Sequence, residues 1–370
     1  MEQATYYIAA DELRSFMIDV FRGAGVPDED ARICADVLIT SDLRGIESHG
    51  VQRLKMYFDR IRSGIQKAVT EYEIVREGPT TALVDGHHGM GHVIGYRSMQ
   101  MAIEKAKKYG MGSVAVRNST HFGIDGYYPL MAIKAGMAGM SFTNARPTIS
   151  PTFGVTPLLG TNPIAFGVPS DEDVPFLFDA ATSIIQRGKV EVHAREGKQL
   201  EEGWVIDEYG NPAIDPPKIL AGLEKDQFSL LPLGGAEEEF GGHKGYGLAT
   251  MVEIFSAAFQ SGAFLHDLLG IDKEGKKRPF MVGHFFMAID ISQFVPLEEF
   301  KNTTGSILRE LRDSKKQPGQ DRIYTAGEKE YYNTKRIQEE GIPIIPNLQK
   351  DFIYLVKELG LTKYKFPFLG

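Results

Sequence analysis

Apolar residues recur every three to four positions near both ends of the chain, which is the spacing of amphipathic helices. The first such stripe predicts a helix that ends near Gly23, and it comprises Leu13, Phe16, Met17, Val20 and Phe21. Pro27 and the acidic residues after it favour the start of a second helix. Its apolar face comprises Ala31, Cys34, Val37 and Leu38. Further helices are expected over most of 296–314 and 328–360.

The pattern changes at about residue 70, where short apolar runs replace the helical stripes. Strands are predicted at 73–75, 81–84, 112–116, 138–143, 163–168, 175–179 and 281–291, and helices at 92–109 and 126–136. Strands that alternate with helices indicate a layered α/β unit. Because several strands follow one another with no helix between them, we expect a mixed sheet and not a purely parallel one.

The composition narrows the class of protein. With 370 residues, the chain is long enough for two or three compact units. Lys and Arg total 41 against 49 Asp and Glu, and no basic stripe occurs, so we expect no nucleic-acid partner. The single cysteine, Cys34, excludes an intrachain disulfide. No apolar run approaches the ~20 residues of a membrane span, and the N-terminus does not resemble a signal peptide. We therefore expect a cytoplasmic, soluble protein with no membrane partner.

The most informative segment is Ser48-His49-Gly50-Val51-Gln52-Arg53, which precedes apolar residues at helical spacing. We expect Ser48 to cap a helix, with His49 in its first turn and Arg53 one turn later on the same face. A histidine that exchanges a proton with a hydroxyl group and an arginine that binds a carboxylate suit a 2-hydroxy or 2-keto acid. The alternative is a capping or surface histidine with no catalytic role.

Other segments carry candidate ligands. His121 follows a predicted strand, at a position where α/β proteins place chemistry. Asp179 precedes Ala180 and Ala181, whose small side chains permit close approach of a ligand. Thr161 lies in a turn that is either only a turn or a source of polar donors beside a substrate.

Two glycine-rich segments are similar to phosphate-binding loops. Residues 241–245, which include His243 and Lys244, precede a helix and would bind an anion such as a dinucleotide pyrophosphate. A flexible loop is the alternative. Gly89, Gly91 and Gly95 follow a strand as in a dinucleotide fingerprint, but the third glycine is one residue late. With no clear βαβ pair around them, we interpret them as a loop that caps a helix. The histidines at 87, 88 and 92 lack further ligands, so no metal site is expected.

Taken in order, these motifs resemble those of the malate/L-lactate dehydrogenase family of the second type. The resemblance rests on Ser-His-Gly with Arg four residues after His, Thr-His-Phe-Gly, Gly-Thr-Asn-Pro, Phe-Asp-Ala-Ala-Thr-Ser, Gly-Gly-His-Lys-Gly-Tyr-Gly-Leu and the late Gly-Glu pair at 327–328. It runs from about residue 8 to 360. Ureidoglycolate dehydrogenase, sulfolactate dehydrogenase, diketogulonate reductase and a cyclic-imine reductase are related members.

The resemblance implies a fold outside the Rossmann class. The expected fold is a three-layer α/β/α unit with a mixed seven-stranded sheet, like that of sulfolactate dehydrogenase, plus a helical domain. The helical domain is expected to comprise 1–75 and about 300–370, and the nucleotide-binding α/β domain 76–299. The resemblance also implies a homodimer or higher oligomer with its active site near the interface. The implied cofactor is NAD or NADP, without a metal.

The resemblance further implies roles for individual residues. His49 corresponds to the proton donor, with Ser48 as its relay partner, although His121 is the acid/base residue in some relatives. The substrate-binding positions are Arg53, Thr161, Arg187 and Gly188. The cofactor-binding positions are His121, Phe122, Gly123, Ile124, Asp125, Asp179, Ala180, Ala181, His243, Lys244, Gly327 and Glu328. Two positions depart from the family pattern: Lys189 replaces an Asp that completes a relay in some relatives, and Ala326 replaces a common Pro.

The sequence therefore predicts an NAD(P)-dependent oxidoreductase that acts on a small 2-hydroxy acid, of the malate or lactate type. The alternative within enzymes is a reductase of a cyclic imine, a keto-sugar acid or a ureidoglycolate-like substrate. The alternative outside enzymes is a non-catalytic NAD(P)-binding protein. The residues do not distinguish NAD from NADP. Arg146, Lys189 and His193 are candidates for binding a second carboxylate.

Overall fold

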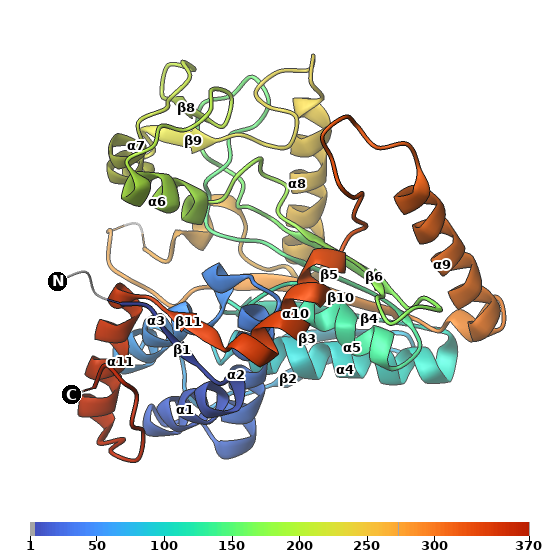
Figure 1. Cartoon of the computed structure of the whole chain (residues 1–370), viewed down its shortest axis with the longest axis horizontal. Coiled ribbons are helices and arrows are strands. Elements are labelled where there is room, and N and C mark those ends of the chain that lie inside the picture. The colour runs from blue at the N-terminus through green and yellow to red at the C-terminus, as the bar shows by residue number, and fades with distance from the viewer. Residues whose placement is uncertain (1–3, 273, 370) are drawn as a thin grey trace.

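A mixed sheet of seven strands forms the centre of the computed structural model, which describes residues 4–272 and 274–369 (Figure 1). The strands are β2 (Glu73–Glu77), β3 (Thr81–Asp85), β4 (Met111–Ser119), β5 (Ala138–Thr143), β6 (Ile164–Val168), β7 (Phe176–Ala180) and β10 (Val282–Ile289). Their order is β2-β3-β4-β10-β5-β6-β7. Only β3 and β4 are parallel neighbours; the other pairs are antiparallel. The predicted mixed seven-stranded sheet is confirmed.

Helices cover both faces of this sheet, which gives the three expected layers. On one face lie α4 (Gly91–Tyr109) and α5 (Tyr127–Lys134), and on the other lies α8 (Gly242–Ala257). Successive residues of β10 serve the two faces, as the two-residue period of a strand requires. Phe286 packs in the core beneath α4 and α5, whereas Phe285 packs with Phe142 and Val252 of α8.

The glycine-rich run before α4 differs from the sequence interpretation in one respect. Because β3 and β4 are parallel and α4 connects them, the segment is a βαβ unit. Its glycines serve packing. A Cβ on Gly91 would overlap the backbone carbonyl groups of Thr120 and His121, and one on Gly95 would lie 2.7 Å from the ring of Tyr128. The glycines therefore let the loop after β4 lie directly against α4.

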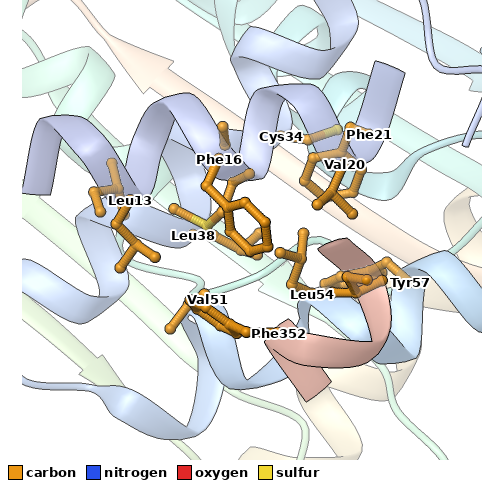
Figure 2. Packing of buried hydrophobic residues seen from close by; sticks show 14 of the residues in the cluster. Leu13, Phe16, Val20, Phe21, Cys34, Leu38, Val51, Leu54, Tyr57 and Phe352 are labelled. Atoms are coloured by element: carbon orange, nitrogen blue, oxygen red, sulfur yellow. The ribbon is translucent and has the colours of Figure 1, made fainter. Parts of the chain in front are cut away.

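The N-terminal helices and the last helix share a second core. It joins α1 (Ala10–Gly23), α2 (Asp28–Leu43) and α3 (Leu54–Arg62) to α11 (Pro346–Leu359). Figure 2 shows Phe352 of α11 among the apolar side chains of the first three helices, with the buried Cys34 in the same cluster. The chain ends also pair directly, because β1 (Tyr6–Ile8) is antiparallel to β11 (Ile342–Ile344). This pair was not predicted from the sequence.

Two C-terminal helices lie in different places. The helix α10 (Glu328–Glu340) packs against α2, whereas α9 (Leu297–Asp313) lies at the β7 side of the sheet, away from α1 and α11 (Figure 1). From α9, Arg309 pairs with Asp171, and Arg312 pairs with Glu172, in the loop between β6 and β7. The division into a 1–75 plus 300–370 domain and a 76–299 domain stays a prediction.

A small unit that the sequence did not reveal covers one end of the sheet. It comprises α6 (Arg187–Glu196), β8 (Val205–Asp207), α7 (Pro216–Gly222) and β9 (Phe228–Leu230), around its own apolar core. Short 3₁₀ turns occur at Glu47–His49, Val51–Arg53, Leu223–Lys225, Ala258–Gln260, Leu265–Leu269 and Ile291–Gln293. Within the described residues, no helix has both the length and the apolar character that crossing a membrane requires.

The contact between the chain ends gives a test of the fold. Phe352 is fully buried, and its ring lies 4.7 Å from that of Phe16. We expect Phe352→Ala to lower the free energy of unfolding by about 3–5 kcal/mol, because it leaves a cavity in the shared core. The measurement is urea denaturation followed by circular dichroism. Ile353→Ala, at the next position but 43% exposed, should cost less than about 1 kcal/mol. Equal losses for the two variants would contradict the packing.

Candidate active site

A cleft opens at one edge of the central sheet, where β4, β5 and β7 end and where β6 and β10 begin. Its main cavity has a volume of about 400 Å³. Eleven of the predicted site residues line it: Ser48, His49, His121, Phe122, Gly123, Ile124, Asp125, Thr161, Asp179, Ala180 and Ala181. Segments distant in the sequence thus meet at a single cavity.

Two adjoining cavities extend the cleft. One, of about 770 Å³, shares Ser48 and Gln186 with the main cavity and is also lined by Arg53 and Gly188. The other, of about 300 Å³, shares Asp179 and is also lined by Gly327. The shared lining residues make the three cavities one elongated cleft, which suits a long ligand beside a small one.

The segment that carries His49 and Arg53 differs from the predicted helix. His49 ends the first of two 3₁₀ turns, Arg53 ends the second, and α3 begins only at Leu54. Ser48 is not a helix cap; its Oγ lies 2.8 Å from Nδ1 of His49. The Nε of Arg53 donates a hydrogen bond to the carbonyl oxygen of Ser48 at 2.6 Å. The two predicted side chains therefore remain neighbours, but through turns and not through one helical face.

Asp42 of α2 explains why the helix is interrupted. Its Oδ2 accepts a hydrogen bond from the backbone N–H of Val51 at 2.8 Å, between the two turns. A Cβ on Gly50 would overlap the same carboxyl group, so only glycine fits there. Asp42 is buried, and burial raises the pKa of its carboxyl group. This anchor fixes the backbone on both sides of Gly50, and with it His49 and Arg53.

His121 is held by a phenol. Tyr57 of α3 lies with its hydroxyl oxygen 2.6 Å from Nδ1 of His121, and the N–H of Gly123 points at the same atom from 3.3 Å. Burial raises the pKa of Tyr57, so its hydroxyl group keeps its proton and donates it. Nδ1 is then an acceptor, and the neutral ring carries its proton on Nε2. His121 therefore presents an N–H donor on the other side of its ring.

The loop that carries His121 has a rigid aromatic support. The ring of Phe122 stacks between His284 at 4.3 Å and Tyr128 at 4.7 Å. The hydroxyl group of Tyr128 donates to the carbonyl oxygen of Phe122 at 2.5 Å. His284 in turn bridges Thr143 and Ser119, each at 2.8 Å. The loop is thus fixed to β4, β5 and β10 at the floor of the cleft.

The two site histidines are neutral at ordinary pH. Their rings stack with centroids 5.4 Å apart and planes 24° apart. Burial, and then the nearby charge of Arg53, lower the pKa of His49 to about 4. Burial, and then His49, hold the pKa of His121 well below its usual value. Burial and the charge of Arg53 are therefore the causes of the neutral His49. A neutral imidazole can accept a proton from a hydroxyl group.

Two buried carboxyl groups, those of Asp125 and Asp179, also line the main cavity. The Oδ2 of Asp179 accepts the backbone N–H of Gly126 at 2.7 Å, and burial raises the pKa of Asp179 to about 6. Burial and the neighbouring Asp179 also hold the pKa of Asp125 well above its usual value. Both carboxyl oxygens of Asp125 are buried without a hydrogen-bond partner among the described residues. Because buried polar groups in proteins are normally paired, Asp125 is suited to bind polar groups of a ligand.

Some predicted residues lie elsewhere. His243 and Lys244 are exposed at the start of α8 and do not line the three cavities. Glu328 is buried and accepts the N–H of Thr325 at 3.0 Å, so it closes its own loop. Arg187 pairs with Glu191 within α6 at 3.0 Å. A Cβ on Gly188 would lie 4.0 Å from that of Ser48, so α6 begins beside the turn that carries His49.

The three residues predicted as candidates for binding a second carboxylate lie in different places. Arg146 lines the main cavity, and Lys189 lines the cavity that contains Arg53. His193 points elsewhere, because its Nδ1 lies 2.9 Å from the carbonyl oxygen of Gln199 and its ring packs against Trp204.

Sequence reasoning missed two residues of α3, Tyr57 and Arg60. Tyr57 was interpreted only as part of an apolar stripe, and Arg60 was not singled out. Yet both face the site: Tyr57 binds His121, and Arg60 lines the main cavity. The signal was present in the spacing, since Arg53, Tyr57 and Arg60 follow one another at intervals of four and three, which is one face of a helix.

The chain is similar to known dehydrogenases over nearly its whole length. The chain is 46% identical over 354 residues to a malate dehydrogenase of Pyrococcus horikoshii, covering 96% of each chain. It is 37% identical over 357 residues to a malate/(S)-sulfolactate dehydrogenase of Methanothermus fervidus, covering 96% and 98%. The crystal structure of malate dehydrogenase from Entamoeba histolytica superposes with a TM-score of 0.93 at 44% identity, covering 96% and 99%. The sequence profile described as malate/L-lactate dehydrogenase matches residues 8–352, and the chain therefore belongs to that family of dehydrogenases, as its motifs predicted.

Proposed function

We propose that this protein is an NAD(P)-dependent dehydrogenase that transfers a hydride between nicotinamide and C2 of a small 2-hydroxy acid of the malate type. One observation carries the proposal: a neutral His49, the guanidinium group of Arg53 and a second neutral histidine converge on one cleft. Membership of a dehydrogenase family that acts on hydroxy acids supports it.

The residues of the cleft fit a nicotinamide cofactor. Ala180 and Ala181 line two of the cavities with small side chains, which leaves space for a flat ring. The unpartnered carboxyl group of Asp125 can bind the carboxamide or ribose donors of such a molecule. Gly327, on the third cavity, has φ +84° and lies against Leu177, where a Cβ would be 2.9 Å from the backbone. When bound, the nicotinamide supplies the acceptor for the hydride that leaves C2.

The chain's own residues supply orientation and proton transfer. We propose that Arg53 binds the C1 carboxylate of the substrate through the guanidinium nitrogens that do not bind Ser48. His49 accepts the hydroxyl proton as C2 loses its hydride, and returns it in the reductive direction. Ser48 fixes the His49 ring through Nδ1. The Nε2–H of His121 donates to the same substrate oxygen and stabilises its developing carbonyl character.

His49→Ala tests the principal acid/base residue. We expect kcat for malate oxidation to fall by roughly 10²–10⁴-fold, the usual contribution of a positioned proton acceptor. The affinity for NADH, measured by fluorescence titration, should stay within about threefold, since the variant leaves Asp125 and Asp179 intact. The matched control is His193→Ala, whose ring is held on Gln199 outside the cleft. Normal turnover in His49→Ala together with loss in His121→Ala would assign the role to His121.

Arg53→Gln tests the electrostatic effect of Arg53 on His49. The charge of Arg53 lowers the pKa of His49, so its removal raises that pKa from about 4. Oxidation needs neutral His49, and kcat/KM falls as the pH drops through its pKa. The acid limb of the kcat/KM profile should therefore move to higher pH in the variant. The KM for malate should also rise roughly 10- to 100-fold through loss of charged hydrogen bonds. An unshifted acid limb with a raised KM would place Arg53 too far from His49.

We also propose a homodimer that uses the exposed apolar residues of α8 and of the 3₁₀ turn that follows it at Ala258–Gln260. Ile254 is 50% exposed and Phe259 60% exposed, beside an apolar groove of about 400 Å³ that Ile254 lines. A contiguous patch of this kind is typical of an interaction surface. Ile254→Asp should convert a dimer to monomers in light scattering at micromolar concentration, whereas Phe294→Asp, an exposed aromatic position outside α8, should not. A monomeric wild-type protein would refute the proposal.

A further inference from the structure

Arg60 is a cation of the main cavity that the reaction proposed above does not use. It lies on α3, one turn beyond Tyr57, and shares the cavity lining with His49 and His121. Its guanidinium group lies over the ring of Phe280, 4.6 Å from the centroid. Among the described residues, the side chain of Arg60 forms no hydrogen bond or ion pair. Its five N–H donors are therefore available to a ligand.

Three other partly buried arginines of this protein each have a carboxylate partner. Arg97 pairs with Asp30 at 2.7 Å, Arg117 with Asp85 at 2.8 Å and Arg312 with Glu172 at 2.6 Å. Burial is the largest influence on Arg60 and lowers its pKa, and the neighbouring groups that also influence it are Tyr57 and Arg53, neither of them a carboxylate. A partly buried guanidinium without an anion is costly unless a ligand supplies one.

The contact with Phe280 positions the guanidinium group of Arg60 without a hydrogen-bond acceptor. A guanidinium group that stacks on an aromatic ring uses its face, while all its N–H groups lie in its plane. Phe280 also lines the main cavity. The ring therefore holds the plane of Arg60 at the cavity wall without consuming a hydrogen bond.

The position of Arg60 relative to Arg53 indicates which anion it binds. The two arginines precede and follow Tyr57 on one face, and Tyr57 binds His121. Arg60 lines the main cavity together with His49 and His121, and Arg53 lines the adjoining cavity. The charges of both arginines help to lower the pKa of His121. A substrate with an anionic group at each end would contact both.

We infer that Arg60 binds a second anionic group of the substrate, a carboxylate or sulfonate, while Arg53 binds the C1 carboxylate. This inference rests on the proposed function and specifies its substrate class: 2-hydroxy acids with two anionic groups, in preference to those with one. A phosphate group of the cofactor is the other anion that this cleft would receive, and the experiment below distinguishes the two.

The test compares two substrates in wild type and Arg60→Met, which removes the charge but keeps an apolar side chain over Phe280. One substrate is malate, and the other is 2-hydroxybutanoate, which has a methyl group in place of the second carboxylate. We expect kcat/KM for malate to fall roughly 10- to 100-fold through loss of charged hydrogen bonds, mainly through KM. The value for 2-hydroxybutanoate should change by less than threefold. Arg60→Lys should restore part of the malate activity.

The matched control is Arg62→Met. Arg62 lies two residues further along α3, is exposed and pairs with Glu358 at 3.3 Å. Neither substrate should be affected. Equal losses for malate and 2-hydroxybutanoate in Arg60→Met would overturn the inference, because the residue would then act on chemistry common to both. A weakened affinity for NADH in fluorescence titration, with an unchanged ratio of the two substrates, would assign Arg60 to the cofactor and also overturn it.

A binding measurement separates this inference from the proposed function. Isothermal titration of each acid into the wild type and Arg60→Met, in the presence of NADH, requires no turnover. Weaker binding of malate alone supports a second anion site even if no 2-hydroxy acid is oxidised, in which case only the proposed function fails. Unchanged malate binding in Arg60→Met overturns the inference whatever the turnover.

Discussion

The contact of Asp42 with the backbone at Gly50 and Val51 is the constraint on which the site depends. The carboxyl group receives the N–H of Val51 and occupies the space that a side chain at position 50 would need. It therefore prevents a continuous helix from forming across His49 and Arg53 and replaces it by two short turns. Those turns direct His49 and Arg53 to adjoining cavities. One small molecule can therefore contact Arg53 with its carboxylate and His49 with its hydroxyl group.

Burial determines the protonation states of the ionisable groups in the cleft. Removal of water disfavours the charged form of each ionisable group. It leaves His49 and His121 neutral, keeps the proton on Tyr57 and raises the pKa of Asp125. A proton acceptor, an N–H donor and an unpaired carboxyl group consequently occupy one cleft. The arginines are the exception, because a guanidinium keeps its charge when partly buried and so binds anions.

The scaffold supplies rigidity by close packing around small residues. Gly91 allows the loop after β4 to touch the start of α4, and the stack of His284, Phe122 and Tyr128 fixes that loop from below. A glycine pattern similar to a dinucleotide fingerprint therefore serves to position His121. Glycines in this order after a strand can permit the close approach of a phosphate group or of the chain's own backbone. Only the residues that surround the glycines in the folded chain show which of these two roles they have.

The sequence by itself determined the strands of the central mixed sheet, most of the helices that cover it and the family, because periodicity and ordered motifs are local properties of the chain. It also identified His49, Arg53 and His121. It could not reveal the Asp42 anchor, the Tyr57 hydrogen bond or the partly buried Arg60 beside Phe280, since each depends on residues brought together from separate elements. Nor could it show that His243 and Lys244 lie outside the cleft. Burial and proximity decide whether a histidine is neutral or a guanidinium has a partner, and both arise only when the chain is folded.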